Sequence, residues 1–417
     1  MNANEGFYFQ DGYLYCAGLS VQEIQRHVEH SPFYLYSASQ IRQNYRSYEK
    51  ALDTTPALIS YAVKANSNLT ILKILRDLGS WVTLVSWNEL RLALAAGFES
   101  KQMILNGNGK TLRELEYAIN MDVLINIDSE FDVKHLNQVS QSIGKSVNVL
   151  LRINPDIDPA VHPYISTGLQ GSKFGIQPQQ IEQFLQSIDA TPLLNLVGIH
   201  SHLGSTIENA DVFRQMSVVM AAYFEMMRKR GFPVKYINLG GGLGIDYQHA
   251  GPDFIQPKDM VEAIQGELPD DAILILEPGR SLVGNAGILV CKVIGVKLAE
   301  TKNFIVVDGS MTELIRPSLY QATHGIAFIE PVVAEKKYFD VVGPVCESAD
   351  FLGKNQLLAM PDENMGLVVY DTGAYGYVMS SNYNARTRPP EYLVEDGQLI
   401  QIRRAERFED YLSLFDV

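Results

Sequence analysis

The sequence predicts an α/β protein: a (β/α)8 TIM barrel and a separate, mostly β C-terminal domain that also includes the N-terminal segment. Eight short aliphatic or β-branched segments recur between residues 57 and 277, and helix-like segments separate them. After residue 283, strand-like segments follow one another with few helices. The 417 residues are enough for a barrel and one further module. A doubly wound open sheet is the alternative that the same alternation allows.

The barrel prediction depends on strands and helices that alternate in order along the chain. The expected strands are residues 57–64, 81–86, 102–106, 123–128, 146–154, 194–202, 236–240 and 272–277. Helix-like segments 69–79 and 88–97 both end on glycine, the residue that favours a helix C-terminus. Segment 111–121 opens with Thr111 and has Glu114 three residues later, which is the pattern of a capping box.

The β domain is predicted from strand-like segments at both ends of the chain. Those near the C-terminus are residues 287–300, 301–309, 338–347, 365–371 and 398–404. The N-terminal stretch "GFYFQDGYLYCAG" predicts a hairpin that joins them. We therefore expect a barrel at residues 34–283, and a β domain formed by residues 1–33 and 284–417.

Composition narrows the class of protein. A net charge of −14 without a cationic cluster argues against nucleic-acid binding. No apolar run of 18 residues predicts a membrane span, and the N-terminus lacks the pattern of a signal peptide. The three cysteines, Cys16, Cys291 and Cys346, are too few for a disulfide framework. These features predict a soluble, cytoplasmic enzyme.

Polar side chains stand at the ends of the expected strands, where a barrel carries its catalytic groups. They include Lys64, Asn106, Asn126, Asp128, Arg152, Asn154, His200, His202, Glu277 and Arg280. In the first strand, alternation places Ser60, Ala62 and Lys64 on one face. We expect these small neighbours to leave room for the lysine to reach the rim.

Taken singly, these residues have ordinary explanations. Lys64 suits a solvated strand end, Glu277 suits an ion pair with Arg280, and the glycines of "NLGGGLG" suit a tight turn. His200 and His202 resemble two zinc ligands, but no third ligand stands at zinc spacing, so no metal is expected. Together, a lysine, an imidazole, a glycine turn and a carboxylate on one rim are what pyridoxal 5'-phosphate requires.

Several motifs then carry a family resemblance along nearly the whole chain. They are "YAVKAN", "GIHSHLGS", "NLGGGLGIDY", "EPGRSLVGNAG", "DGSMTELIRPSLY", "GPVCESADFLG" and "TGAYGYVMSSNYN". In these motifs the sequence resembles the barrel-type (fold type III) pyridoxal-phosphate-dependent decarboxylases, and within them the meso-diaminopimelate decarboxylase family. One departure is Trp87, which stands where the family usually has glycine; it either narrows the site entrance or points away from it.

The resemblance implies a role for each matching residue. The cofactor-binding residues would be Lys64, which forms the imine, with His202, Ser205, Gly240, Gly241, Gly242, Glu277, Gly279, Arg280 and Tyr375. The substrate-binding residues would be Arg280, Arg316, Tyr320, Glu347 and Tyr375. Arg316 and Glu347 suit the carboxylate and ammonium at the far end of the substrate. Cys346 would act as the catalytic acid in the partner subunit's site, which implies a homodimer with shared active sites.

The implied reaction converts meso-2,6-diaminopimelate to L-lysine and CO2, the last step of lysine biosynthesis. Three alternatives stay open from the residues: a decarboxylase of the same fold acting on ornithine, lysine or arginine, an amino-acid racemase, and a non-catalytic cofactor-binding regulator. The polar, glycine-bearing stretch 158–176 is expected to be a mobile lid.

Overall fold

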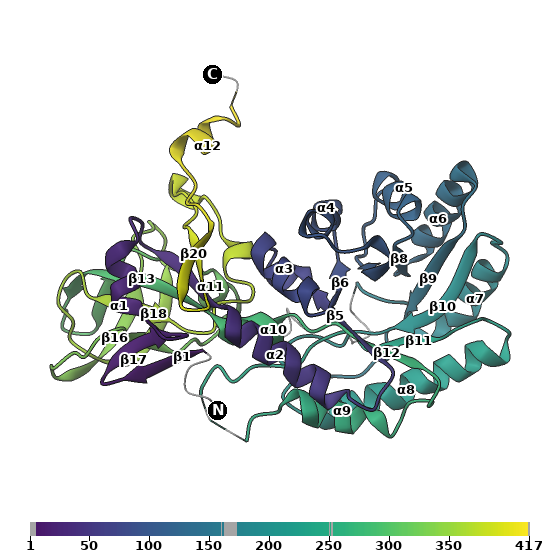
Figure 1. Ribbon diagram of the computed structural model, residues 1–417, viewed down its shortest axis with the longest axis horizontal. Helices are drawn as coiled ribbons and strands as arrows, with labels where there is room; N and C mark the ends of the chain where they lie inside the picture. The colour runs from purple at the N-terminus through teal and green to yellow at the C-terminus, as the bar shows by residue number, and fades with distance from the viewer. Residues whose placement is uncertain (1–5, 160, 162–172, 250, 252, 416–417) are drawn as a thin grey trace. The chain divides into compact units, whose positions relative to one another are not determined.

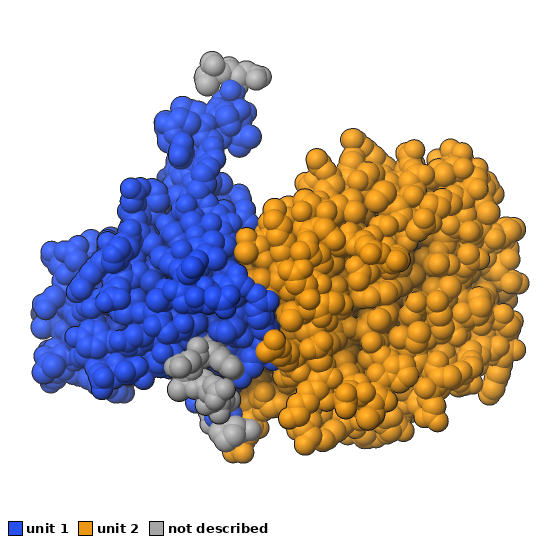
Figure 2. Space-filling model, in the orientation of Figure 1, with its two compact units in different colours: residues 1–44, 246–252, 282–417 blue, residues 45–245, 253–281 orange. Residues whose placement is uncertain are grey.

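The computed structural model describes residues 6–159, 161, 173–249, 251 and 253–415. The chain forms two compact units (Figure 1, Figure 2). Unit 1 contains residues 1–44, 246–252 and 282–417, and unit 2 contains residues 45–245 and 253–281. The functional domains expected at residues 34–283 and on either side stay a prediction. Most of the expected lid lies outside the described residues.

Unit 2 contains a closed barrel of eight strands in the order β10-β11-β12-β5-β6-β7-β8-β9. The strands are β5 (Ala57–Ala62), β6 (Trp81–Leu84), β7 (Met103–Leu105), β8 (Leu124–Ile127), β9 (Val147–Arg152), β10 (Leu194–His200), β11 (Tyr236–Asn238) and β12 (Ile273–Leu276). All neighbours pair in parallel, and the pairing of β9 with β10 closes the ring. The eight predicted strands are confirmed, and the open sheet is excluded.

Helices pack around the outside of these strands (Figure 1). They are α3 (Leu69–Asp77), α4 (Trp87–Ala96), α5 (Leu112–Asn120), α6 (Glu130–Ile143), α7 (Ile181–Asp189), α8 (Ala210–Lys229) and α9 (Pro257–Gln265). The three helices expected from the sequence are confirmed. α4 ends at Gly97 with a φ of 90°, and Thr111 and Glu114 form the reciprocal capping box of α5.

One apolar cluster fills the barrel and receives a residue from every strand. Its members are Leu58, Trp81, Ile104, Leu124, Leu150, Val197, Tyr236 and Ile275. Residues from eight different strands can meet only inside the ring, so this cluster is a packed core and not a pore. Two residues further along β5 and β6, Ser60 and Thr83 follow Leu58 and Trp81. Their hydroxyls lie 2.8 Å apart. The barrel interior therefore changes from apolar to polar toward the strand ends.

The first barrel strand is shorter than the sequence predicts. β5 ends at Ala62, and Lys64 lies in the short 3-10 turn Val63–Ala65. The ladder with β6 stops where Ala62 pairs with Thr83, and the Ala62 N–H instead donates to the carbonyl of Pro278 at 3.1 Å. The prediction that strand alternation sets the direction of Lys64 is therefore wrong, because this turn sets it.

Unit 1 is built around a nine-stranded sheet with the main order β17-β16-β14-β13-β4-β19-β20, to which β15 and β18 attach. The strands are β4 (Phe33–Ser37), β13 (Gly287–Lys297), β14 (Asn303–Val307), β15 (Ile326–Phe328), β16 (Lys336–Val342), β17 (Phe351–Ala359), β18 (Gly366–Val369), β19 (Glu391–Glu395) and β20 (Gln398–Arg403). β4 pairs with both β13 and β19, so the beginning and the end of the chain share one sheet. The five β segments expected after residue 283 are confirmed.

The N-terminal hairpin also belongs to unit 1. β1 (Phe7–Gln10) and β2 (Tyr13–Cys16) pair antiparallel, and Asp11 and Gly12 form the turn with φ of 52° and 82°. The sheet continues with β3 (Leu19–Ser20). This confirms the predicted hairpin.

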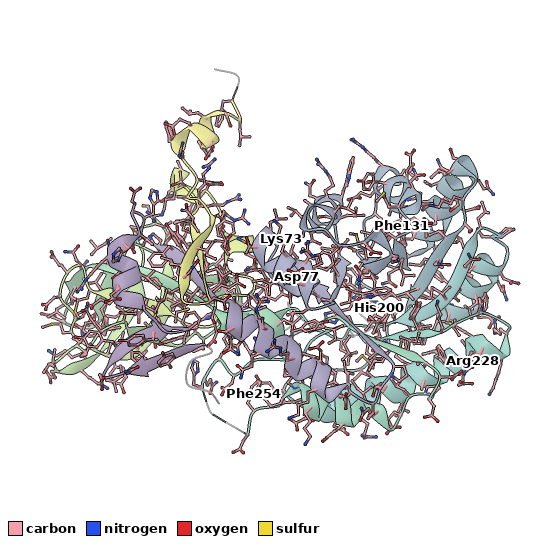
Figure 3. All side chains as sticks on the ribbon, viewed as in Figure 1. Lys73, Asp77, Phe131, His200, Arg228 and Phe254 are labelled. Atoms are coloured by element: carbon pink, nitrogen blue, oxygen red, sulfur yellow. The ribbon has the colours of Figure 1, made fainter. Side chains whose placement is uncertain are left out.

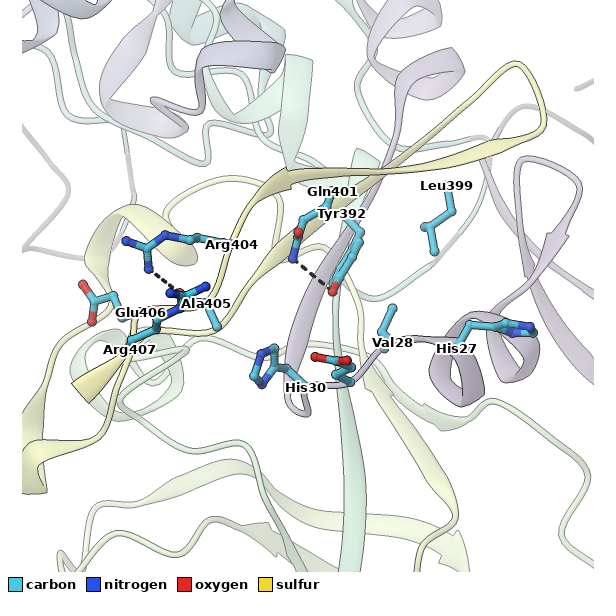
Figure 4. A pocket seen from close by; sticks show the side chains of 11 residues that line it. His27, Val28, His30, Tyr392, Leu399, Gln401, Arg404, Ala405, Glu406 and Arg407 are labelled. Atoms are coloured by element: carbon cyan, nitrogen blue, oxygen red, sulfur yellow. Dashed lines mark hydrogen bonds between the residues drawn. The ribbon is translucent and has the colours of Figure 1, made fainter. Parts of the chain in front are cut away.

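The other α-helices of the described residues are α1 (Val21–His27), α2 (Ala38–Ala51), α10 (Arg280–Val283), α11 (Arg316–Tyr320) and α12 (Phe408–Leu412). In the part of the chain that the structure describes, no helix is long and apolar enough to span a bilayer. A surface pocket of about 490 Å3 lies in unit 1, and His30, Tyr392 and Arg407 are among the residues that line it (Figure 4). None of its lining residues is among those predicted to bind cofactor or substrate.

Candidate active site

The carboxylate of Glu277 lies just after β12 and is buried, with 7% of its surface exposed. Asn106 donates from Nδ2 to both carboxylate oxygens, at 3.1 and 3.2 Å. Asn238 donates from Nδ2 to Oε1 at 2.8 Å. The Oδ1 atom of Asn238 accepts the backbone N–H of Gly240 at 2.8 Å, which fixes the direction of its amide. Side chains from two other strand ends therefore hold Glu277 as an anion.

His200 is the third polar neighbour of this carboxylate. It is buried at the end of β10 within unit 2 (Figure 3). Asn126 donates from Nδ2 to Nδ1 of His200 at 3.0 Å, so the proton of a neutral ring is on Nε2. That Nε2 lies 3.4 Å from Oε2 of Glu277.

Burial and neighbours shift the pKa values of this pair. Burial alone would raise the pKa of Glu277, but His200 and the Asn238 amide outweigh it and lower the pKa to about 2. Burial lowers the pKa of His200 more than the nearby Glu277 raises it. At neutral pH the site therefore contains an ionised carboxylate beside a neutral imidazole.

His202 and Lys64 share this part of unit 2. Burial, followed by the charges of Lys64 and Arg152, lowers the pKa of His202 well below its usual value. Glu89 also lies within the electrostatic range of Lys64, although burial raises its pKa. Lys64 therefore lies within electrostatic range of His202 and Glu89, and the imidazole of His202 is neutral at neutral pH.

The glycines after β11 allow two loops to approach closely. Gly240 has a φ of 66°, and a Cβ there would lie 2.7 Å from the carbonyl oxygen of Ser201. A Cβ on Gly241 would collide with the carbonyl oxygen of Glu277. The Ile207 N–H donates to the carbonyl of Gly242 at 2.9 Å, which joins the loops after β10 and β11. This turn suits a phosphate, since a chain without side chains exposes its backbone N–H groups.

Ser205 and Arg280 meet beside this turn. Nε and Nη2 of Arg280 donate to Oγ of Ser205 at 3.2 and 2.9 Å. A Cβ on the intervening Gly279 would lie 3.0 Å from Cβ of Ala65, so the "EPGR" turn packs directly on the turn that contains Lys64. Unit 2 thus brings together Lys64, His202, Ser205, Gly240, Gly241, Gly242, Glu277, Gly279 and Arg280.

The other predicted residues lie in unit 1. Arg316 and Tyr320 are the first and last residues of α11, and the Arg316 side chain is buried. Tyr375 has a φ of 56° in the loop after β18. Cys346 and Glu347 lie in an exposed turn after β16, where the Cys346 N–H donates to Oδ1 of Asn384 at 3.0 Å.

Trp87 packs between two outer helices. It is the first residue of α4, and the Arg113 guanidinium lies 4.0 Å from the centroid of its ring. Its ring also lies 6.0 Å from that of Tyr117. Both partners are on α5, so Trp87 contacts the helix layer, and its effect on the site entrance stays a prediction.

Sequence reasoning did not assign roles to several residues near Glu277, His200 or Lys64. Asn106, Asn126, Asn238 and His200 were noted as polar strand ends or passed over, and Glu89 was not singled out. For the three asparagines and His200, a position at or just after a strand end was the signal that could have found them. Glu89 lies within α4 and has no such signal. The contacts of the three asparagines and His200 form only when the closed barrel brings the ends of β7, β8, β10 and β11 close to the end of β12.

These features fit one cofactor. The anionic Glu277, the neutral imidazole of His202, the amine of Lys64, and the glycine turn beside Ser205 and Arg280 match the ring nitrogen, ring face, aldehyde and phosphate of pyridoxal phosphate, in that order. Among the described residues, no cluster of three or more His, Cys, Asp or Glu side chains could hold a metal ion. Fold and site together define a barrel enzyme that binds pyridoxal phosphate.

Known proteins share this sequence and fold. Residues 38–284 match the family described as pyridoxal-dependent decarboxylase, pyridoxal binding domain. The chain is 51% identical to probable diaminopimelate decarboxylase, chloroplastic, from Oryza sativa subsp. japonica, over 97% of this chain and 84% of that one. It is 39% identical to diaminopimelate decarboxylase from Aquifex aeolicus, over 97% of this chain and 96% of that one. The crystal structure of diaminopimelate decarboxylase from Helicobacter pylori complexed with L-lysine is similar to this structure, with a TM-score of 0.90 and 35% sequence identity. The match covers 94% of this chain and 98% of that one. The chain belongs to the diaminopimelate decarboxylase family.

Proposed function

We propose that this chain is a carbon-carbon lyase that decarboxylates meso-2,6-diaminopimelate to L-lysine and CO2, the last step of lysine biosynthesis. One observation carries the proposal: an ionised Glu277 is held at the same barrel end as Lys64 and His202, in a chain of this family. The binding of L-lysine, the reaction product, by the relative from Helicobacter pylori supports the same substrate class.

Bound pyridoxal phosphate supplies an aldehyde for amines and a ring that accepts electrons. Lys64 would hold the aldehyde, and the turn of Gly240 to Gly242 would hold the phosphate with Ser205 and Arg280. His202 would lie against the ring face. Glu277 would hold a proton on the ring nitrogen, because amide donors keep its carboxylate ionised.

The substrate has an ammonium and a carboxylate at each end, so the distal end needs both an anion and a cation. We propose that Arg316 binds the distal carboxylate as a planar fork and that Glu347 binds the distal ammonium. Tyr320 and Tyr375 complete this part of the site. Cys346 gives its thiol proton to the carbon that has lost CO2.

We also propose a homodimer with shared active sites. Cys346 and Glu347 are both exposed in the single chain, although the proposed chemistry requires them to contact substrate. A partner subunit would cover them and receive them into its own site. The unpaired state of Cys16, Cys291 and Cys346 favours a reducing compartment, and we propose the cytoplasm.

A decarboxylase of ornithine, lysine or arginine is the second candidate, since it uses the same cofactor machinery. The test is CO2 release from meso-diaminopimelate, compared with L-lysine, L-ornithine and L-arginine, with added pyridoxal phosphate. We expect release from diaminopimelate alone. Release from the other three, with none from diaminopimelate, would refute the proposed substrate, and no release from any would favour a racemase or a non-catalytic regulator.

The cofactor assignment is tested by Lys64→Ala. We expect this variant to lose the visible absorption of the bound cofactor and all measurable turnover, because no other residue is proposed to bind the aldehyde. Lys73→Ala is the matched control, since Lys73 is an exposed lysine of α3 (Figure 3). A Lys64→Ala protein that stays yellow and active would contradict the assignment.

A further inference from the structure

Arg316 has a buried partner that the proposed function does not use. The residue is 4% exposed, and its Nε donates to Nε2 of His324 at 3.3 Å. His324 is 2% exposed. An arginine side chain rotates easily about its last bonds, so a bond at Nε restricts the plane of the whole guanidinium.

The second nitrogen of His324 decides its proton state. Nδ1 lies 2.8 Å from the carbonyl oxygen of Tyr370, and a carbonyl oxygen only accepts. Nδ1 therefore carries the proton, and the neutral ring has its lone pair on Nε2. That lone pair is the acceptor that the Arg316 N–H requires. The backbone of Tyr370 thus selects the tautomer that can hold Arg316.

Tyr247 supports the same pair from a third side. Its ring meets the His324 ring edge to face, with centroids 5.1 Å apart. The Arg316 Cζ lies 5.2 Å from the centroid of Tyr247, within cation–π range. Tyr247 comes from the segment 246–252, which follows the glycine turn in the chain and belongs to unit 1. Three segments far apart in sequence therefore fix one guanidinium.

We propose that His324 is a positioning residue that sets the plane of Arg316 and thereby determines the preference for substrates with a distal carboxylate. This inference rests on the proposed function of the site. Because Nε of Arg316 donates to His324, the two terminal nitrogens, Nη1 and Nη2, are the ones that would bind the distal carboxylate of the substrate. A guanidinium held in one plane loses less conformational entropy when it binds a planar carboxylate than a rotating one does.

Two substitutions separate the two nitrogens of His324. The amide of Asn lies near the position of Nδ1 and can keep the bond to Tyr370, but it does not reach Arg316. The longer Gln places its oxygen near Nε2 and can still accept from Arg316. We expect His324→Asn to raise the KM for meso-diaminopimelate about tenfold, and His324→Gln to raise it by less than about threefold.

L-Lysine, the product, keeps the distal carboxylate, because CO2 is lost at the other end of the substrate. The internal control is therefore cadaverine, which is the same diamine without that carboxylate. Its inhibition constant should stay within about twofold of wild type in both variants, because it has no group for Arg316 to bind. If His324→Asn weakens the binding of diaminopimelate and cadaverine equally, or leaves both unchanged, the proposal is overturned. A purely structural defect would weaken both ligands.

A double-mutant cycle tests whether His324 acts through Arg316. In an Arg316→Gln background, adding His324→Asn should change the KM for diaminopimelate by less than about twofold. A further tenfold rise there would refute a role through Arg316. If wild-type protein does not decarboxylate diaminopimelate, the proposed function itself fails; if it does and the cycle is additive, only the inference fails.

Discussion

At the scale of single residues, Glu277 shows how amide donors stabilise a buried charge, in addition to the more distant charge of Arg152. Its oxygens accept from two amides, and one of these amides is itself fixed by the backbone of Gly240. An amide donor stabilises the anion without a charge that would compete for the cofactor. Asn238 also connects Glu277 with the glycine turn, because the same side chain bonds to the carboxylate and to the Gly240 N–H.

The buried histidines predict how stability depends on pH. Burial lowers the pKa of His200 and His202 from an ordinary value of 6.5. The unfolded chain therefore takes up protons at a higher pH than the folded chain does, and stability falls as the pH drops through about 6.5. The melting temperature of the cofactor-free and cofactor-loaded protein, measured from about pH 8 to about pH 5, should decline across this window.

His200→Gln should make that decline shallower, since one of the two groups no longer titrates. His30→Gln is the control, because His30 is an exposed histidine of unit 1. A decline that is equally steep in His200→Gln and wild type would show that buried His200 does not contribute.

At the scale of elements, the turn after β11 is the part of the site with the least space. Gly241→Ala should move this turn, since the new Cβ would overlap the carbonyl oxygen of Glu277. Overpacking of this kind costs about 1–3 kcal/mol, so we expect a clearly weaker affinity for pyridoxal phosphate, measured by titration of visible absorption.

Gly266→Ala is the matched control for Gly241→Ala. Gly266 follows α9 with a φ of −74°, and no heavy atom lies within 4 Å of a Cβ built there. Its affinity for the cofactor should equal that of wild type. Equal affinities in all three proteins would show that close packing of the turn does not matter for cofactor binding.

The sequence predicted most elements because their signals are local. Strands appear as short apolar segments, and the start of α5 follows from Thr111 and Glu114 alone. The end of β5 was misplaced by two residues because it depends on where pairing with β6 stops and on a bond to Pro278, which are both distant in sequence. The strands β4, β15, β17 and β19 were not singled out, since their patterns resemble those of loops and other apolar segments.

The candidate site was predicted only in part, for a similar reason. Motif residues such as Lys64 and Glu277 were chosen from polar strand ends and from a family resemblance. The contacts of Asn106, Asn238 and His324 have no local signature, because an amide or imidazole has the same sequence pattern whether it faces water or a buried charge. Only the closed barrel and the paired segments of unit 1 make these partners visible.

At the scale of the whole molecule, the proposed shared sites predict complementation between inactive variants. Lys64→Ala and Cys346→Ala should each be inactive as homodimers. When the two are unfolded together and refolded as an equal mixture, half of the dimers are mixed and contain one complete site. The mixture should therefore regain about a quarter of wild-type activity.

The control for this experiment mixes Lys64→Ala with Glu277→Gln. Both residues belong to unit 2 of the same chain, so no combination of subunits creates a complete site. Recovery in the control, or its absence in the first mixture, would argue against a site shared between subunits.

The segment 246–252 has a consequence for engineering. The chain leaves the barrel unit after residue 245 and returns to it at residue 253. Between these points, Tyr247 lies beside Arg316 in unit 1. A hybrid enzyme that joins this barrel to the β unit of a relative at residue 283 would therefore carry a foreign tyrosine segment against a new arginine. Such chimeras should exchange residues 246–252 together with the C-terminal part of the β unit, because Tyr247 and Arg316 lie in contact range of each other.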